Sequence, residues 1–277
     1  MNIFWIHSLR ATAMIMVIIL HAAAPILYRL NKVPLIEWVT GNVYDSLMRA
    51  CVPIFFMISG FLLLSKDEPI SDFLKKRASK IVIPLAFWSI FYLLWKIYFE
   101  GFNVSLASGL LNAIFTPTYF HLWFVYSIAG LYLAIPIIRK FTTSATNSQL
   151  FYFTAIWFFT CSLLPIIEKH LHIKSKYDLF MFGGYLGYMI LGQLLGRLQY
   201  RNIHAITAFL LILLCWGVTA TGTHYLSINK GVFSDSYYGY FSPAVAFAAA
   251  AQFILFKHVF SMFTFSEHSI LNRVIVS

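Results

Sequence analysis

Apolar residues recur along this chain in long stretches, and polar and turn-forming residues gather in the short segments between them. Each stretch reaches about the 20 residues that a helix needs to cross roughly 30 Å of hydrocarbon. The pattern therefore predicts an all-α, polytopic bundle of about eight transmembrane helices. We place them at residues 6–30, 46–65, 80–99, 121–138, 150–167, 179–197, 203–221 and 240–263. The stretch 104–116 could form a loop, or an interfacial or re-entrant segment.

The composition is that of a membrane protein. Hydrophobic residues make up 60% of the chain and charged residues 11%, against roughly 25% charged residues in an ordinary soluble domain. No soluble domain of any size fits between the predicted helices, so we expect residues 1–277 to form a single integral-membrane domain. Cys51, Cys161 and Cys215 fall inside apolar stretches without metal-ligand spacing, and no metal site is expected.

The formal net charge of +10 falls mainly on one side of the predicted membrane topology. Lys and Arg near the ends of transmembrane helices stay in the cytoplasm, and the surplus lies on the side of the N-terminus. That side collects Arg10, Lys66, Lys75, Lys76, Arg77, Lys80, Arg139, Lys140, Arg197, Arg201, Lys257 and Arg273. We therefore predict a cytoplasmic N-terminus and no nucleic-acid partner. The first helix has no cleavage site after it and is expected to remain in the mature protein.

Small and charged residues interrupt the apolar stretches at a few positions. Small-xxx-small pairs on the sixth predicted helix favour close helix packing; they are formed by Gly183, Gly187, Gly192 and Gly196. Arg10 and His21 in the first helix, and Arg49 in the second, are the candidates for chemistry. A charged or titratable group in a bilayer is costly, so each one needs either a partner or a function.

Arg10 and His21 are eleven residues apart, which returns a helix to within about 20° of the same direction and separates them by about 16 Å along the axis. If Arg10 lies at the cytoplasmic mouth, His21 lies roughly halfway or more across a core of about 30 Å. A neutral imidazole there can exchange protons or be acylated. A histidine that only hydrogen-bonds to a neighbouring helix is the alternative, and the arginine in register favours a functional role.

Several other sequence segments follow this pair in a characteristic order along the chain. The chain reads Arg10, then ATAMIMVIIL, then His21; RACVPIFFMISG follows over residues 49–60, KRASKIVIP over 76–84 and HLWF over 121–124. In this order the chain resembles the acyltransferase 3 family of membrane O-acyltransferases. The resemblance extends across nearly the whole chain.

The resemblance implies that an acyl group, usually acetyl from acetyl-CoA, is transferred to a hydroxyl of a cell-envelope glycan in the bacterial inner membrane. Because no hydrolase-like domain follows, the chain is most similar to members that acetylate lipid-linked glycans such as enterobacterial common antigen or O-antigen. The phosphates of the donor should dock where cations gather, at Lys76, Arg77 and Lys80. Arg77 is the first choice because its guanidinium binds phosphate in a bidentate manner. This basic segment could instead serve membrane topology alone.

The resemblance also suggests roles for single residues. His21 would take the proton from the attacking hydroxyl or carry the acyl group itself, and Arg10 would hold a donor phosphate or steer the acyl chain. His121 and Trp123 could form an acceptor subsite, although interfacial aromatic residues are common in membrane proteins. Further substrate contacts could come from Arg49 and Ser59, which are equally plausible as packing residues.

Three departures from the family pattern matter. His7 stands where an acidic residue is usual, and Lys80 stands where a second arginine is expected. After SEHS at 266–269 the family continues into further helices, whereas this chain stops at Ser277. We therefore expect about two helices of the family to be missing, so the chain could be a fragment, a truncated allele or a short member.

Two other function classes stay open. Buried charges and bent helices also mark the substrate pathways of an exporter or flippase, but we find no paired half-sequences with matching interrupted helices. A scaffold or sensor would leave the register of Arg10 and His21 unexplained. The expected partners are therefore the bilayer, an acyl-CoA donor and a surface glycan acceptor.

Overall fold

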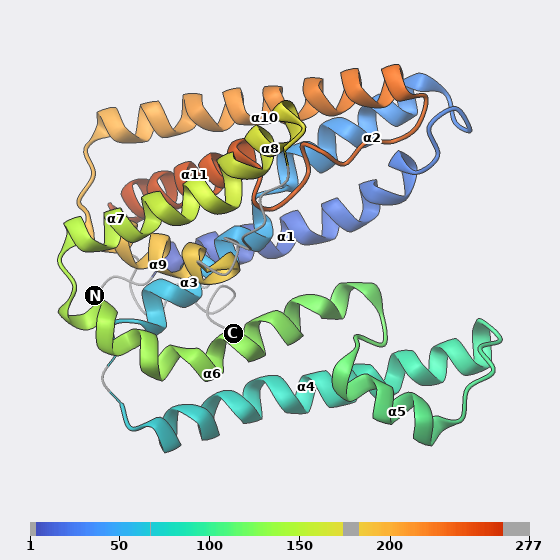
Figure 1. The fold of residues 1–277 in the computed structure, drawn as a ribbon, viewed down its shortest axis with the longest axis horizontal. Coiled ribbons are helices and arrows are strands. Elements are labelled where there is room, and N and C mark those ends of the chain that lie inside the picture. The colour runs from blue at the N-terminus through green and yellow to red at the C-terminus, as the bar shows by residue number, and fades with distance from the viewer. Residues whose placement is uncertain (1–3, 67, 174–182, 263–277) are drawn as a thin grey trace. The chain divides into compact units, whose positions relative to one another are not determined.

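The computed structural model describes residues 4–66, 68–173 and 183–262, and the regular structure within them is helical throughout (Figure 1). The α-helices are α1 (Phe4–Leu27), α2 (Leu35–Met48), α3 (Cys51–Leu63), α4 (Ile70–Phe99), α5 (Leu106–Phe115), α6 (Trp123–Ser144), α7 (Asn147–Phe158), α8 (Leu164–Leu171), α9 (Gly184–Arg197), α10 (Asn202–Lys230) and α11 (Pro243–Ser261). A 3₁₀ turn, Phe120–Leu122, precedes α6, and a π-helical turn, Phe159–Leu163, joins α7 to α8. The predicted all-α class is confirmed.

Among the described residues, seven helical segments are long and apolar enough to cross a membrane. One of them, Leu35–Leu63, joins α2 and α3 and begins well before the predicted boundary at residue 46. The polar residues Asn42 and Asp45 concealed this first half. The predicted span 179–197 lies partly outside the described residues, and its described part is the 14-residue helix α9.

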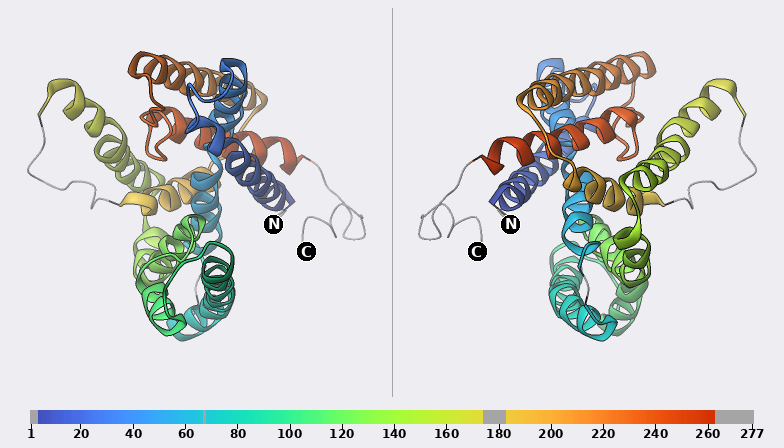
Figure 2. Two further views of the ribbon diagram at one scale, coloured as in Figure 1. Left: turned by 90° about the vertical axis from the view of Figure 1, so that its right-hand side faces the viewer. Right: turned by 90° about the vertical axis from the view of Figure 1, so that its left-hand side faces the viewer.

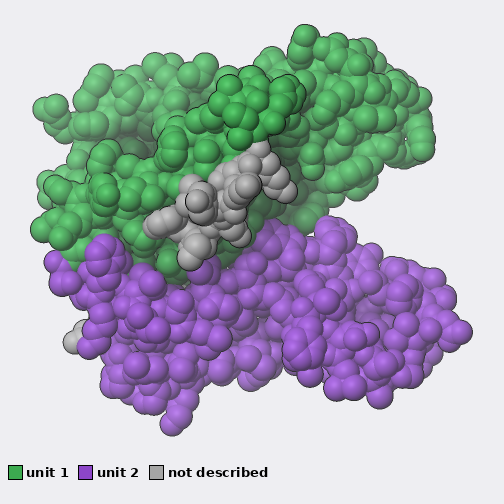
Figure 3. Space-filling view, viewed as in Figure 1, with its two compact units in different colours: residues 1–64, 145–277 green, residues 65–144 purple. Residues whose placement is uncertain are grey.

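The chain divides into two compact units (Figure 3). Unit 1 consists of residues 1–64 and 145–277, and unit 2 of residues 65–144. The division falls at the connections on either side of α4, α5 and α6. The expectation of a single domain stays a prediction.

Unit 1 is built by close helix packing. α10 packs along α11, and α1 packs against α2, α3 and α11 (Figures 1 and 2). α3 and α9 approach so closely that a β-carbon at Gly60 would overlap the Met189 carbonyl, and one at Gly192 would overlap the Met57 backbone. A β-carbon at Gly187 would meet the Trp157 ring. The close packing predicted for the glycines of α9 is therefore confirmed.

Replacing Gly60 with leucine is expected to destabilise the protein by about 3 kcal/mol, at the upper end for overpacked cores, because the clash is with backbone and no rotamer relieves it. Thermal unfolding of the purified protein in detergent, followed by size-exclusion chromatography, measures this. Gly217→Leu is the matched control, since no atom lies within 4 Å of a β-carbon there. Equal loss of folded protein in both variants would contradict this account of the packing.

Unit 2 contains α4, α5 and α6. α4 packs against both other helices, and Phe73 near its start is fully buried against Tyr132 of α6, with ring centroids 6.2 Å apart. α5 begins at a Ser105 cap whose hydroxyl accepts from the Ser108 amide, so the stretch 104–116 contains a helix of ten residues. Farther along, the three helices leave a largely apolar pocket of about 310 Å³.

Candidate active site

Helix α1 carries Arg10 and His21 on its exposed side. The helix is continuous from Phe4 to Leu27, and Met14 and Ile18 between the two residues are exposed as well. The opposite side is buried in unit 1 through Leu9, Ala13, Met16 and Leu20. The side of α1 that carries Arg10 and His21 is therefore exposed within unit 1.

The break between α2 and α3 brings a second cation to His21. Arg49 lies at the turn between these helices, and its positive charge is near enough to interact electrostatically with the His21 imidazole. Because α2 and α3 form one candidate span, Arg49 lies in the interior of that span. A guanidinium at such a position needs a compensating group.

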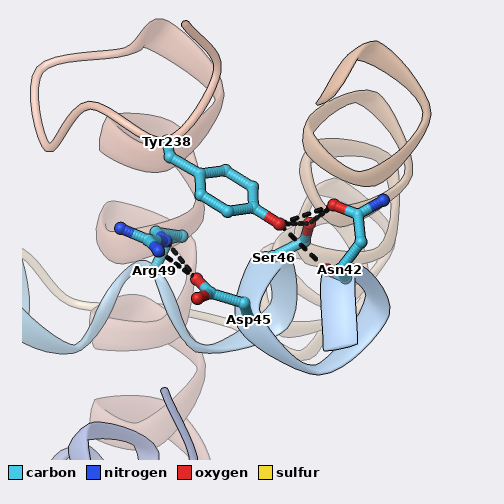
Figure 4. Close-up of polar contacts among 5 residues, drawn as sticks. All are labelled: Asn42, Asp45, Ser46, Arg49 and Tyr238. Atoms are coloured by element: carbon cyan, nitrogen blue, oxygen red, sulfur yellow. Dashed lines mark hydrogen bonds and ion pairs between the residues drawn. The ribbon is translucent and has the colours of Figure 1, made fainter. Parts of the chain in front are cut away.

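Asp45, one helical turn before Arg49, supplies the compensating charge (Figure 4). The two side chains form an ion pair, and Asp45 is fully buried whereas the Arg49 side chain is 15% exposed. The Arg49 guanidinium also lies 4.0 Å from the centre of the Tyr238 ring. The second carboxylate oxygen of Asp45 is buried without a hydrogen-bond partner among the described residues.

Tyr238 is held by a buried hydrogen-bond network. Its hydroxyl donates to the Asn42 side chain and accepts from Ser46 at 3.2 Å (Figure 4). The Asn42 amide donates in turn to the carbonyl of Ala220 on α10 at 2.8 Å. The network fixes the ring beneath Arg49, because each hydroxyl or amide position has a defined partner.

This cluster opens into a pocket of about 230 Å³. Its wall contains Arg49, Asp235 and Tyr240 together with Tyr28, Phe233 and Tyr238. Burial raises the pKa of Tyr240 to about 12 and also raises that of Tyr238, so both phenols keep their protons near neutral pH. The pocket thus combines aromatic faces, hydroxyl donors, a carboxylate and a cation.

The basic segment of unit 2 has a different geometry. The Arg77 guanidinium carbon lies 5.6 Å from the centre of the Phe73 ring and 5.8 Å from that of Tyr132. Lys76 donates to the Glu68 carboxylate at 3.1 Å, and this hydrogen bond lowers the pKa of Glu68. Lys80 is exposed. Arg77 is therefore oriented by aromatic rings, while the two lysines reach toward solvent.

His121 and Trp123 lie at the start of α6 in unit 2. The His121 ring packs edge-on against Tyr92 at 4.8 Å between centres and contacts Tyr119 at 5.4 Å. Tyr92 and Tyr119 stack on each other at 4.8 Å, and Trp123 is half-buried beside Phe124. His121 thus belongs to an aromatic cluster with Tyr92 and Tyr119, and Trp123 packs beside Phe124.

The predicted site residues divide between the two units. Unit 1 holds Arg10, His21, Arg49 and the half-buried Ser59, and unit 2 holds Lys76, Arg77, Lys80, His121 and Trp123. Sequence reasoning missed Asp45, which lies one residue before the predicted helix at 46–65, and Tyr238. The spacing of four residues between Asp45 and Arg49 could have indicated an ion pair on one helix side. No local sequence pattern indicates Tyr238.

One of three comparisons with known proteins gives a match. A family model described as an acyltransferase domain, that of the acyltransferase 3 family, matches residues 3–273 and so covers both units. No curated protein and no solved structure matches the chain. With nearly the whole length matched, the chain belongs to the acyltransferase 3 family and is a membrane acyltransferase.

Proposed function

We propose that this protein transfers an acetyl group from cytoplasmic acetyl-CoA to a hydroxyl of a cell-envelope glycan. The observation that supports this most is in unit 1: His21 interacts with Arg49, which lines a pocket of phenols, a carboxylate and aromatic rings. Hydroxyl donors, charged groups and ring faces suit a sugar better than a hydrocarbon. A family of acyltransferases supplies the reaction class.

The chemistry requires one proton acceptor. In one route, His21 removes the proton from the sugar hydroxyl while the hydroxyl oxygen attacks the thioester carbonyl. The C–S bond then breaks, and the CoA thiolate takes up the proton from His21. In the other, the imidazole attacks the thioester carbonyl, the C–S bond breaks and CoA leaves as the thiolate. The sugar hydroxyl then displaces the acyl group from His21, and its proton passes to the released imidazole and on to the thiolate. Both routes end with the same ester and free CoA. Both place His21 at the reacting carbonyl.

The donor would bind from the cytoplasmic side. The surplus of Lys and Arg supports a cytoplasmic N-terminus, with Arg10 at that end of α1. Arg77, with Lys76 and Lys80, would contact the phosphates of the donor, because acyl-CoA is an anion made in the cytoplasm. Arg10 would hold a donor phosphate or orient the acyl chain toward His21.

The acceptor would enter the pocket of unit 1 from the opposite side. Under the proposed topology, the loop with Asp235, Tyr238 and Tyr240 lies on the outer face of the inner membrane. The aromatic cluster of His121, and Trp123 near it in sequence, would lie on that same face and offer ring faces for a sugar. We propose a lipid-linked surface glycan, such as O-antigen or enterobacterial common antigen, as the acceptor.

Comparison of the surface polysaccharide from cells with and without the gene tests this function. We expect O-acetyl groups to be present only when the gene is present, measured by NMR of the purified polymer. Expression of the His21→Ala protein at the same level should not restore them. An unchanged acetylation pattern in all three strains would exclude acyl transfer to that glycan, and a glycan missing from the surface altogether would indicate export instead.

A further inference from the structure

Two arginine side chains from different helices of unit 2 lie against one aromatic ring. The guanidinium carbon of Arg77, on α4, is 5.6 Å from the centre of the Phe73 ring, and that of Arg139, on α6, is 4.9 Å from it. Phe73 is fully buried and Arg139 is 6% exposed. A ring face orients a guanidinium and leaves its edge free for hydrogen bonds, so this arrangement holds two guanidinium groups against the same ring.

Several of these donors lack an acceptor. Arg139 donates from Nη1 to the backbone carbonyl of Glu68 at 3.1 Å. Its Nε and Nη2, and the Nε of Arg77, are buried without a hydrogen-bond partner in the part of the chain that the structure describes. Buried N–H groups without acceptors are costly, and a guanidinium cannot lose its charge to relieve the cost.

Glu68 compensates these cations only in part. One of its carboxylate oxygens accepts from Lys76 at 3.1 Å, and the other lies 3.6 Å from Nη2 of Arg139, beyond hydrogen-bond distance. A single carboxylate thus faces Lys76 and Arg139. The cluster retains positive charge that a further anion would neutralise.

We propose that Arg77 and Arg139 form a binding site for a phosphate group, which Glu68 partly occupies until the phosphate arrives. A phosphate group has two or three terminal oxygens and can accept hydrogen bonds from both guanidinium groups at once, whereas one oxygen of the Glu68 carboxylate already accepts from Lys76. The phosphate belongs either to the CoA donor or to the headgroup of an anionic phospholipid. The choice of CoA rests on the proposed function, whereas the site itself rests on the geometry around Phe73.

Calorimetric titration of CoA into the purified protein in nanodiscs of zwitterionic lipid tests the donor as the source. Arg139→Gln and Arg77→Gln should each weaken CoA binding about tenfold or more, the effect of losing one charge-assisted hydrogen bond. Glu68→Gln should strengthen binding, because it removes the competing carboxylate. Lys140→Gln is the matched control: it removes the same charge one residue away, on an exposed side chain, and should change binding less than twofold.

The increase in CoA affinity expected for Glu68→Gln cannot result from misfolding, because an unfolded variant would not bind CoA more tightly. Titration of CoA that lacks its 3′-phosphate identifies which phosphate is bound. If Arg139→Gln also weakens the binding of this analogue, the diphosphate occupies the site; if Arg139→Gln leaves its affinity unchanged, the 3′-phosphate does. In anionic nanodiscs, mass spectrometry of retained phospholipid tests the headgroup as the source. If the wild type does not bind CoA, the donor assignment fails while the lipid measurement still tests the site. If Glu68→Gln and Arg139→Gln behave like Lys140→Gln in both measurements, the phosphate site is excluded.

Discussion

Replacement of His21 with alanine is expected to lower kcat/KM for acyl transfer by about 10²- to 10⁴-fold, the usual contribution of a general acid–base residue. The imidazole is the group that both proposed routes place at the thioester carbonyl. Because the side chain is exposed on α1, its removal should change the free energy of unfolding by no more than about 0.5 kcal/mol. Initial rates with the purified protein in proteoliposomes, with thermal unfolding measured on the same samples, separate the two effects.

His170 provides the matched control for this prediction. It is an exposed histidine on α8, with a ring nitrogen 3.2 Å from the Ile166 carbonyl. His170→Ala removes an imidazole of the same unit without touching the candidate site, and its rate should equal that of the wild type. A His21→Ala protein that keeps more than about one tenth of the wild-type rate would argue against both routes, since each requires far more from this residue.

Replacement of Asp45 with alanine is expected to destabilise the protein by about 3–5 kcal/mol, the usual effect of removing one partner of a buried ion pair. Arg49 would keep its charge and its place over the Tyr238 ring but lose the carboxylate. Thermal and denaturant unfolding in detergent should both show the loss. Catalysis should also fall, because Arg49 lines the proposed acceptor pocket.

Two further variants distinguish the lost ion pair from a general loss of packing. Asp235→Ala removes an exposed carboxylate from the same pocket and should change stability by no more than about 0.5 kcal/mol. The double variant Asp45→Leu with Arg49→Met should recover most of the stability lost in Asp45→Ala, because no uncompensated charge remains. If the double variant were as unstable as Asp45→Ala, the unpaired charge would not be the cause.

Hydropathy and helical period were sufficient for most of the fold. The spans were predictable because each crossing must satisfy its own backbone, so apolar length is a direct signal. The glycines of α9 were predictable from their spacing. Gly192 and Gly196 are four residues apart, so both lie on one side of the helix and allow a neighbouring helix to approach closely. The first half of the span Leu35–Leu63 was missed because Asn42 and Asp45 make it look like a polar loop.

The polar partners within the site were less predictable. Arg49 was a candidate from sequence, but Tyr238, which lies under it, bonds to Asn42 across 196 residues of sequence. In unit 2, Arg139 was recognised only as a topology charge, since its contact with Glu68 spans 71 residues. Pairings at such separations depend on how helices pack, and no local spacing encodes them. The sequence can therefore nominate the costly charges, while the fold shows what each one faces.

The most direct test of the proposed function follows a labelled acetyl group from CoA to the glycan. The purified protein is reconstituted in vesicles that contain lipid-linked glycan, and acetyl-CoA with a labelled acetyl carbon is supplied on the side of the basic segment. We predict that label appears in ester linkage on the glycan with the wild type and with His170→Ala, and that it falls to background with His21→Ala. Full labelling with a folded His21→Ala protein, or no labelling with a folded wild type that binds CoA and glycan, would contradict the account.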